Sequence, residues 1–143
     1  MEHVNPYLNF SGNTEEAFNF YKSVFGGEFI QLTRFKDTPE NEKIPAEALD
    51  KIMHISLPIG NGNILMGTDA LECMGQFLKE GNNFHLSIDT ESKEETDKFF
   101  KGLSAGGKVT MPLADTFWDA YFGMVTDKYG VNWMLIFHKN RNR

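Results

Sequence analysis

The chain has 143 residues, of which 41% are hydrophobic and 24% are charged, and its net charge is −6. This balance predicts one folded domain of ordinary size. The acidic excess is scattered, which argues against nucleic acid or a membrane as a partner, because both bind clustered positive charge. The single cysteine, Cys73, excludes an internal disulfide, and neither a signal peptide nor a membrane-spanning stretch is recognisable. We therefore expect a cytoplasmic protein with a solvated basic terminus at residues 139–143.

One segment of the first half recurs in the second half at a constant offset of 79 residues, so that Asn13–Val24 corresponds to Ser92–Leu103. Internal repetition is a strong indicator of architecture. We therefore predict a single pseudo-symmetric domain, 1–143, with a ligand site within or between its two copies. The first module spans 1–70, a connector spans 71–82, and the second module spans 83–143.

The first copy has the pattern of a strand, a helix and three further strands. Asn13 is the expected N-cap of the helix, with Glu16 three residues later as in a capping box, and Gly26-Gly27 ends it. The expected strands are 4–10, 29–35, 52–59 and 63–67, the last two joined by a hairpin at Gly60-Asn61-Gly62. Residues 36–50 are polar and contain two prolines, which predicts a surface loop that is either mobile or a lid.

The second copy repeats this order. Its helix is expected to begin after Ser92, with Glu95 completing a capping box, and to end at Gly106-Gly107. The expected strands are 84–89, 108–113, 121–127 and 131–137.

This βαβββ–βαβββ order, with four sequence segments, resembles the vicinal oxygen chelate superfamily of glyoxalase I, bleomycin-resistance proteins and extradiol dioxygenases. The segments are 5–10, 20–28, 65–69 and 117–133. Within the superfamily the chain is most similar to the PhnB-like branch, also called demethylubiquinone methyltransferase-like. The resemblance implies an α+β fold in which two βαβββ modules form a cup-shaped mixed sheet, the glyoxalase/bleomycin-resistance fold. It also implies a homodimer.

Metal-dependent members of the superfamily place one His or Glu ligand on each of four cup-lining strands. The resemblance puts these positions at Pro6, Leu65 or Met66, Asn83 and Met134. None of these side chains offers a carboxylate or an imidazole, the groups that hold zinc, manganese or iron. We therefore predict that the usual metal site is absent and that the protein has no cofactor, with a divalent metal on displaced ligands as the alternative.

The catalytic candidates are His54, His85 and Asp119, because a histidine pair with a carboxylate can transfer protons or bind a metal. A hydrogen-bonded core histidine is the favoured interpretation of either histidine. Cys73 has no cation near it in sequence and is not expected to be a nucleophile.

A ligand pocket is predicted from aromatic and methionine side chains, which suit a flat apolar ligand although they are equally common in protein cores. Its expected residues are Phe10, His54, Met66, His85, Trp118, Tyr121 and Met134. Trp118 is the best candidate for stacking on a ligand.

The leading functional hypothesis is a metal-independent binding protein for a small apolar or aromatic molecule. One alternative is a lyase, isomerase or dioxygenase-type enzyme that uses His54 and His85 as acid–base groups or as displaced metal ligands. Another is a dimeric interaction module without a ligand. Methyl transfer is not supported by the sequence. Folds that bind adenosylmethionine place a glycine-rich turn between a strand and a helix, whereas Gly60-Asn61-Gly62 joins two strands. A doubly negative ligand is not supported either, because Arg34 alone provides too little positive charge to bind it.

Overall fold

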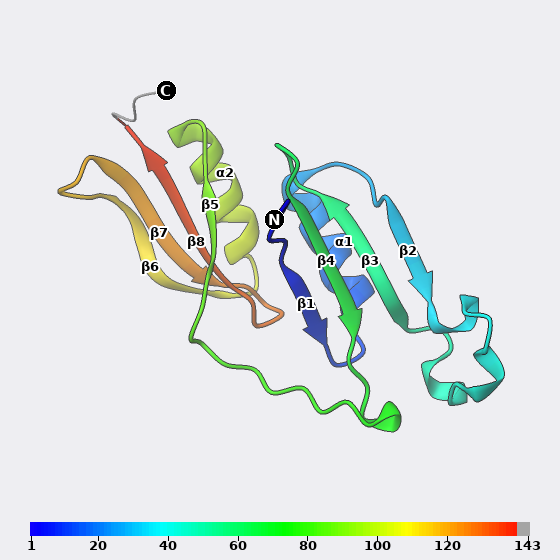
Figure 1. Cartoon of the computed structure of the whole chain (residues 1–143). Coiled ribbons are helices and arrows are strands. Elements are labelled where there is room, and N and C mark those ends of the chain that lie inside the picture. Colours follow the sequence, from blue (N-terminus) through cyan, green and yellow to red (C-terminus); the bar gives the residue numbers. More distant parts are fainter. Residues whose placement is uncertain (140–143) are drawn as a thin grey trace. The chain divides into compact units, whose positions relative to one another are not determined.

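The computed structural model describes residues 1–139, so most of the basic segment predicted at 139–143 lies outside the described residues. The chain divides into two compact units, Met1–Lys79 and Glu80–Arg143. Each unit contains a four-stranded mixed sheet and one long helix (Figure 1). Within residues 1–139, no helix is both long enough and apolar enough to cross a membrane.

The first unit contains β1 (Tyr7–Phe10), α1 (Thr14–Phe25), β2 (Gln31–Arg34), β3 (Ile52–Pro58) and β4 (Ile64–Asp69). Its sheet has the strand order β1-β4-β3-β2, with β1 parallel to β4 and the other pairs antiparallel. The predicted order is confirmed, although β1 begins after Pro6 rather than at Val4.

The second unit contains β5 (Leu86–Asp89), α2 (Lys93–Ser104), β6 (Lys108–Asp115), β7 (Ala120–Thr126) and β8 (Asn132–His138). The strand order β5-β8-β7-β6 reproduces that of the first unit, again with one parallel and two antiparallel pairs. The duplication predicted from the sequence is therefore present in the topology.

A glycine allows each helix to pack closely on its sheet. A Cβ atom on Gly67 of β4 would lie 2.6 Å from the ring of Phe18 on α1. A Cβ atom on Gly123 of β7 would lie 2.7 Å from the ring of Phe100 on α2. Real Cβ atoms do not approach so closely, so both positions require glycine because of packing rather than because of turn geometry.

The N-termini of the two helices are capped in different ways. Ser92 Oγ accepts a hydrogen bond from the backbone N–H of Glu95, as predicted. The capping box predicted at Asn13 is wrong: in the first turn of α1, all of whose residues are described, the Asn13 side chain accepts no hydrogen bond. Instead, the carboxylate of Asp69 on β4 accepts a hydrogen bond from the backbone N–H of Thr14, the first residue of the helix.

The long polar segment between β2 and β3 is folded into short 3₁₀ turns rather than an irregular loop. These turns are Phe35–Asp37, Asn41–Lys43 and Ala46–Ala48. Ala48 is fully buried, and the backbone N–H of Lys36 donates to the carbonyl of Leu49. This hydrogen bond therefore joins the two ends of the segment, next to the end of β2 and the start of β3.

Candidate functional site

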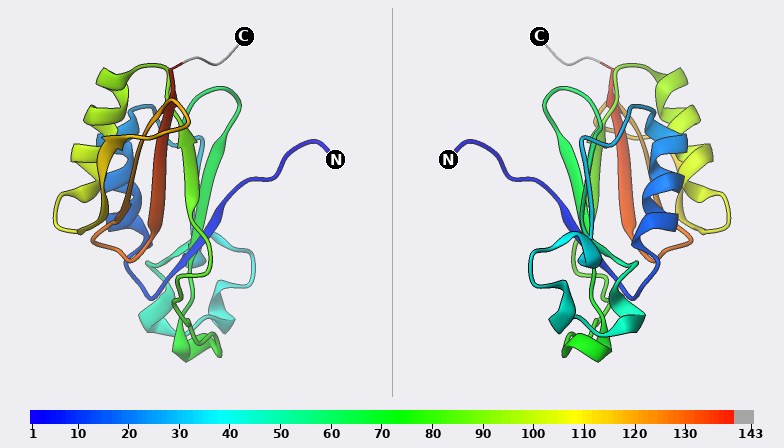
Figure 2. Two further views of the ribbon diagram at one scale, coloured as in Figure 1. Left: turned by 90° about the vertical axis from the view of Figure 1, so that its left-hand side faces the viewer. Right: turned by 90° about the vertical axis from the view of Figure 1, so that its right-hand side faces the viewer.

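Each sheet has one face covered by the helix of its own unit and a second face that we call the helix-free face. Figure 2 shows each sheet nearly edge-on with its helix on one side. Successive side chains of a strand point to opposite faces, so burial and register assign each residue to a face.

In the first unit, the side chains that face α1 form a buried core. They include Leu8, Phe10, Ile55, Leu57 and Leu65. The alternate strand residues lie on the helix-free face. They are Tyr7, Asn9, Gln31, Thr33, His54, Ser56, Pro58, Ile64, Met66 and Thr68.

A hydrogen-bonded line of three side chains crosses this helix-free face. Nε2 of His54 lies 2.8 Å from Oγ of Ser56, and Nδ1 of His54 lies 3.4 Å from the hydroxyl oxygen of Tyr7. Ser56 is 4% exposed and Tyr7 is 45% exposed, so the line runs from a buried end to an open end. An extra residue in β3, Met53, shifts the register so that His54 pairs with Thr33 of β2.

The helix-free face of the first unit is neutral. None of its strand residues, all of which are described, is Asp, Glu, Lys or Arg. Arg34 points to the other side and donates two hydrogen bonds to the carboxylate of Glu15 on α1, at 3.0 and 2.8 Å. This hydrogen bond from Arg34 lowers the pKa of Glu15. Arg34 is therefore engaged in a structural ion pair on the helix side.

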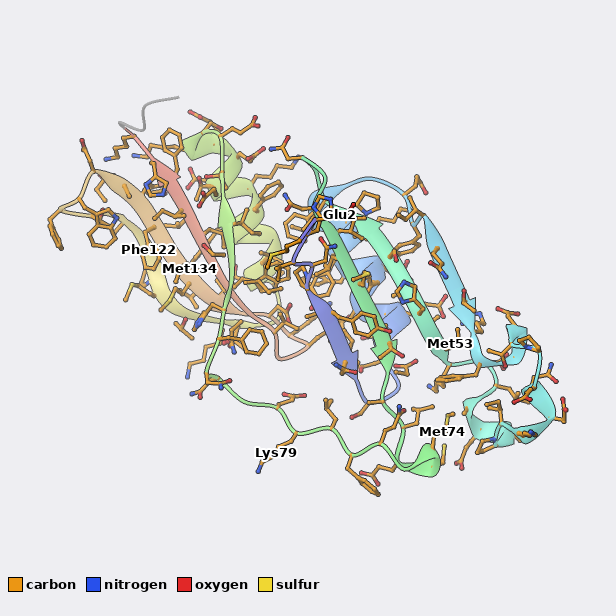
Figure 3. All side chains as sticks on the ribbon, viewed as in Figure 1. Glu2, Met53, Met74, Lys79, Phe122 and Met134 are labelled. Carbon is orange, nitrogen blue, oxygen red and sulfur yellow. The ribbon has the colours of Figure 1, made fainter. Side chains whose placement is uncertain are left out.

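The helix-free face of the second unit has a different character. Ser87, Met134, Met124 and Met111 are consecutive cross-strand neighbours on β5, β8, β7 and β6. Three thioethers thus lie in one row across the sheet. Phe122 pairs with Ile136 beside this row, and Figure 3 shows Phe122 and Met134 on adjacent strands. The centre of this face is apolar.

Trp118 lies in the turn between β6 and β7, next to Phe122. Its ring centre is 6.3 Å from that of Phe122 and 5.0 Å from that of Phe117. Trp118 is 50% exposed and Phe117 is 98% exposed. The turn is fastened by Thr116, whose hydroxyl accepts a hydrogen bond from the backbone N–H of Ala120. Trp118 therefore presents an accessible ring at the margin of the apolar face.

Two of the predicted pocket residues lie on the helix-facing sides instead. Phe10 is 3% exposed, and its ring packs edge-on against Phe18 of α1. The hydroxyl of Tyr121 donates to the carboxylate of Asp97 on α2 at 2.6 Å, and the ammonium of Lys93 lies 4.5 Å from the Tyr121 ring centre. The hydrogen bond to Asp97 raises the pKa of Tyr121 to about 12. Neither side chain shares a face with the other predicted pocket residues of its unit.

The remaining candidates are distributed over both units. His54 and Met66 share the helix-free face of the first unit, and Met134 and Trp118 belong to that of the second. His85 immediately precedes β5 and is half-buried. Asp119 is exposed, has a left-handed backbone with φ of 66°, and its carbonyl accepts a hydrogen bond from the backbone N–H of Lys139.

The residues at the positions that correspond to metal ligands lie in strands or just before them. Of the two candidates for the second position, Leu65 is buried toward α1, whereas Met66 lies on the helix-free face. Pro6 and Asn83 precede β1 and β5, and Met134 is in the methionine row. Among residues 1–139, no three His, Cys, Asp or Glu side chains are grouped in a way that would hold a metal ion.

Two buried carboxylates have roles that the sequence did not reveal. Asp69 is 2% exposed and accepts hydrogen bonds from the backbone N–H groups of Gly12, Thr14 and Ile52. Asp127 is 3% exposed and accepts a hydrogen bond from the indole N–H of Trp133 at 2.8 Å. Each follows a threonine at the end of a strand, and this shared Thr-Asp pair is the signal that could have suggested a common structural role.

Comparison with known proteins identifies the family. The family model described as 3-demethylubiquinone-9 3-methyltransferase matches residues 2–136. The chain belongs to this family. It is 31% identical over 140 residues to protein YjdN of Escherichia coli (strain K12), with 92% of each chain covered.

Solved structures agree with this assignment. Protein PA1353 from Pseudomonas aeruginosa has 37% identity and a TM-score of 0.85, with coverage of 98% of this chain and 100% of that one. A Bacillus cereus PhnB protein, described as a putative 3-demethylubiquinone-9 3-methyltransferase, has 28% identity and a TM-score of 0.71, with coverage of 95% and 99%. The PhnB-like resemblance is confirmed.

The fold extends to more distant proteins. A glyoxalase/bleomycin resistance protein/dioxygenase family enzyme from Burkholderia phytofirmans has 20% identity and a TM-score of 0.63, with coverage of 94% of this chain and 99% of that one. The predicted α+β fold of duplicated βαβββ modules, the glyoxalase/bleomycin-resistance fold, is therefore confirmed.

Proposed function

We propose that the protein binds a small, uncharged apolar or aromatic molecule without a metal ion. The observation that carries this proposal is the row of Met111, Met124 and Met134 across the helix-free face of the second unit. Thioethers are polarizable and adaptable, so a row of them suits a flat ring. Trp118 and Phe122 extend the same surface with aromatic rings.

Binding alone is proposed because the chain offers little machinery for chemistry on this face. Met111, Met124, Met134, Phe122, Ile136 and Ser87 offer no group that exchanges protons at neutral pH. A carboxylate on the same face, that of Asp89, is exposed and lies at the end of β5 as the cross-strand neighbour of Ile136. The positions that correspond to the metal ligands of the superfamily support the same view, since they carry Pro6, Met66, Asn83 and Met134.

Methyl transfer, which the family description names, is not what we propose for this chain. Folds that bind adenosylmethionine place a glycine-rich turn between a strand and a helix. Here Gly60–Gly62 lies in the hairpin between β3 and β4. The N-terminus of α1, where such a ligand would approach, is engaged by the carboxylate of Asp69. Calorimetry with adenosylmethionine is expected to detect no binding.

The binding proposal is tested through the two tryptophans. Trp118 is half exposed beside Phe122 on the helix-free face, whereas Trp133 is 1% exposed and its indole N–H donates to Asp127. A set of neutral bicyclic aromatic compounds is screened by thermal shift and by tryptophan fluorescence, with and without EDTA. We expect a ligand that quenches emission in the natural protein but not in the Trp118→Phe variant, with EDTA having no effect.

Two methionines provide a matched pair of variants. Met134→Gln places an amide in the row and is expected to weaken binding about tenfold, since burying an amide without a partner costs ~1–3 kcal/mol. Met74→Gln changes a residue in a turn of the first unit, and is expected to leave the affinity unchanged (Figure 3). Equal affinity of both variants, or a requirement for a metal, would contradict the proposal.

An acid–base enzyme is the second candidate, because His54 lies within hydrogen-bonding distance of Ser56. Proton exchange at a carbon atom of a bound ligand, followed by mass spectrometry in deuterium oxide, tests it. Exchange that disappears in His54→Gln would support this candidate over simple binding. The other histidine considered, His85, belongs to the other unit.

We also propose that the protein forms a homodimer, as the resemblance implies. Ile30, Phe77 and Phe84 are large apolar side chains that are more than half exposed in the single chain, which supports burial against a partner. Light scattering after gel filtration is expected to give twice the chain mass of 16.3 kDa. A monomer at micromolar concentration would contradict this proposal.

A further inference from the structure

We propose that Tyr7, His54 and Ser56 form a recognition site for a neutral oxygen, a carbonyl or a hydroxyl, on a small aromatic molecule. This site lies on the helix-free face of the first unit and goes beyond the proposed function, because it does not depend on the methionine row of the second unit.

The three side chains can present either a donor or an acceptor at the open end of their line. With Ser56 donating to Nε2 of His54, Nδ1 carries the proton and points to the Tyr7 oxygen, which leaves the Tyr7 hydroxyl free to donate to a carbonyl. With the other tautomer, Tyr7 donates to Nδ1 and its oxygen accepts from a ligand hydroxyl. Both arrangements use the same heavy-atom positions.

The exposure of the three side chains explains why a ligand would contact Tyr7 rather than His54 or Ser56. Ser56 is 4% exposed, and His54 is half-buried between the two hydroxyl groups. Tyr7 is 45% exposed, and its ring lies 5.7 Å from the imidazole. The inner residues therefore orient the outer one, and the phenol oxygen is the atom that a ligand can reach.

The charge of this face selects a neutral oxygen over an anion. Its strand residues contain hydroxyl and amide groups, including those of Asn9, Gln31 and Thr33, but no Lys or Arg. Arg34 is bound to Glu15 on the opposite side of the sheet. A carboxylate or phosphate would lose its hydration without gaining a cationic partner, which is unfavourable.

Met66 gives the site a place for the ring that carries the oxygen. It is the cross-strand neighbour of Tyr7 on one side and of Ser56 on the other. A thioether between the two hydroxyl-bearing residues can contact an aromatic ring while the oxygen of that ring reaches Tyr7. The row Tyr7–Met66–Ser56 therefore combines an apolar contact with a polar one.

The test uses four naphthalenes of similar size on the full-length protein: 2-acetylnaphthalene, 2-naphthol, 2-methylnaphthalene and 2-naphthoate. The first two carry a neutral oxygen, the third carries none and the fourth is an anion. We expect the first two to bind about fivefold more tightly than 2-methylnaphthalene, the value of one hydrogen bond of ~1 kcal/mol. We expect 2-naphthoate to bind no more tightly than 2-methylnaphthalene.

Tyr7→Phe removes only the phenol oxygen. It is expected to abolish the preference for 2-acetylnaphthalene and 2-naphthol while leaving the affinity for 2-methylnaphthalene unchanged. Tyr129→Phe, in the turn before β8 of the other unit, is the matched control and should retain the preference. Nuclear magnetic resonance of imidazole carbons, with His54 assigned from His54→Gln, should show a shift on addition of 2-acetylnaphthalene that is lost in Tyr7→Phe.

Three results would overturn the proposal: equal binding of all four compounds, including no binding by any; tighter binding of 2-naphthoate; or an unchanged preference in Tyr7→Phe. The Met134→Gln variant distinguishes failure of this site from failure of the proposed function. If Tyr7→Phe loses the oxygen preference while Met134→Gln binds the compounds as tightly as the natural protein, this site is supported and binding at the methionine row is contradicted.

Discussion

The carboxylate of Asp69, at the end of β4, accepts a hydrogen bond from the backbone N–H of Thr14 at the first residue of α1, 3.0 Å away and 55 positions distant in the sequence. The hydroxyl of Thr14 donates to the same carboxylate oxygen at 2.6 Å, and the other oxygen accepts from the backbone N–H of Ile52. One side chain thus joins the start of α1, the start of β3 and the end of β4. The negative charge is also favourable at the N-terminus of a helix.

Asp69→Asn is expected to destabilise the protein by about 2–3 kcal/mol, because an amide nitrogen cannot accept the hydrogen bonds that one carboxylate oxygen receives and leaves buried donors unpaired. Urea unfolding followed by circular dichroism measures the change. Asp50→Asn is the control, since Asp50 forms only a surface ion pair with Lys36. A similar stability for the two variants would show that the Asp69 hydrogen bonds contribute little.

Gly67→Ala is expected to destabilise the protein by about 1–3 kcal/mol, because the added methyl group would overlap the Phe18 ring. Phe18→Leu in the same chain should recover part of this loss, so the double variant should be more stable than the sum of the single effects. Gly81→Ala, where a Cβ atom meets nothing within 4 Å, is the control. Strict additivity in thermal unfolding would contradict the proposed overlap.

Tyr121 is expected to remain protonated to unusually high pH, because its hydrogen bond to Asp97 raises its pKa to about 12. The neutral phenol is favoured in the folded state, so its contribution to stability is present below the unfolded-state pKa of about 10 and is lost as the pH rises through 12. Absorbance at 295 nm, taken as the difference between the natural protein and Tyr121→Phe, measures this titration. Asp97→Asn should lower the apparent pKa, whereas Asp89→Asn should not.

The pair of Glu15 and Arg34 is expected to stabilise the protein at neutral pH and to fail in acid. The hydrogen bond from Arg34 lowers the pKa of Glu15, so the contribution is complete above the unfolded-state pKa of about 4.3 and is lost as the pH falls through the lower folded-state value. Both side chains are partly exposed, so Glu15→Gln should cost only about 0.5–1 kcal/mol at pH 7. At pH 2 the two proteins should unfold at the same urea concentration; a difference that persists there would point to packing instead.

The prediction of secondary structure from the sequence succeeded because its signals are local. The helical periodicity of 14–25, the glycines that follow it and the Gly60–Gly62 hairpin each depend on neighbouring residues only. The capping box at Asn13 failed for the opposite reason. A carboxylate from β4 binds the backbone N–H groups of Gly12 and Thr14 on either side of Asn13, and no local pattern indicates a partner 55 residues away.

The candidate site was predicted less well, because the face on which a strand residue lies depends on register. Phe10 and Tyr121 are aromatic strand residues that the sequence placed in the pocket, yet they pack toward α1 and α2. Phe10 and Tyr121 are regularly paired with β4 and β8, but elsewhere irregularities at Met53 in β3 and between Val109 and Met111 in β6 shift the alternation by one residue. A single such shift moves the following side chains to the other face of the sheet.

The sequence by itself determined the duplication, the order of the elements and the absence of His and Glu at the expected metal-ligand positions, because these depend on residue identity and local periodicity. Only the tertiary structure decided that Met111, Met124 and Met134 form one row, and that His54 lies between Tyr7 and Ser56. Both arrangements bring together residues from separate strands, and the pairing that does so is fixed by the packing of each sheet against its helix rather than by any short segment of the chain.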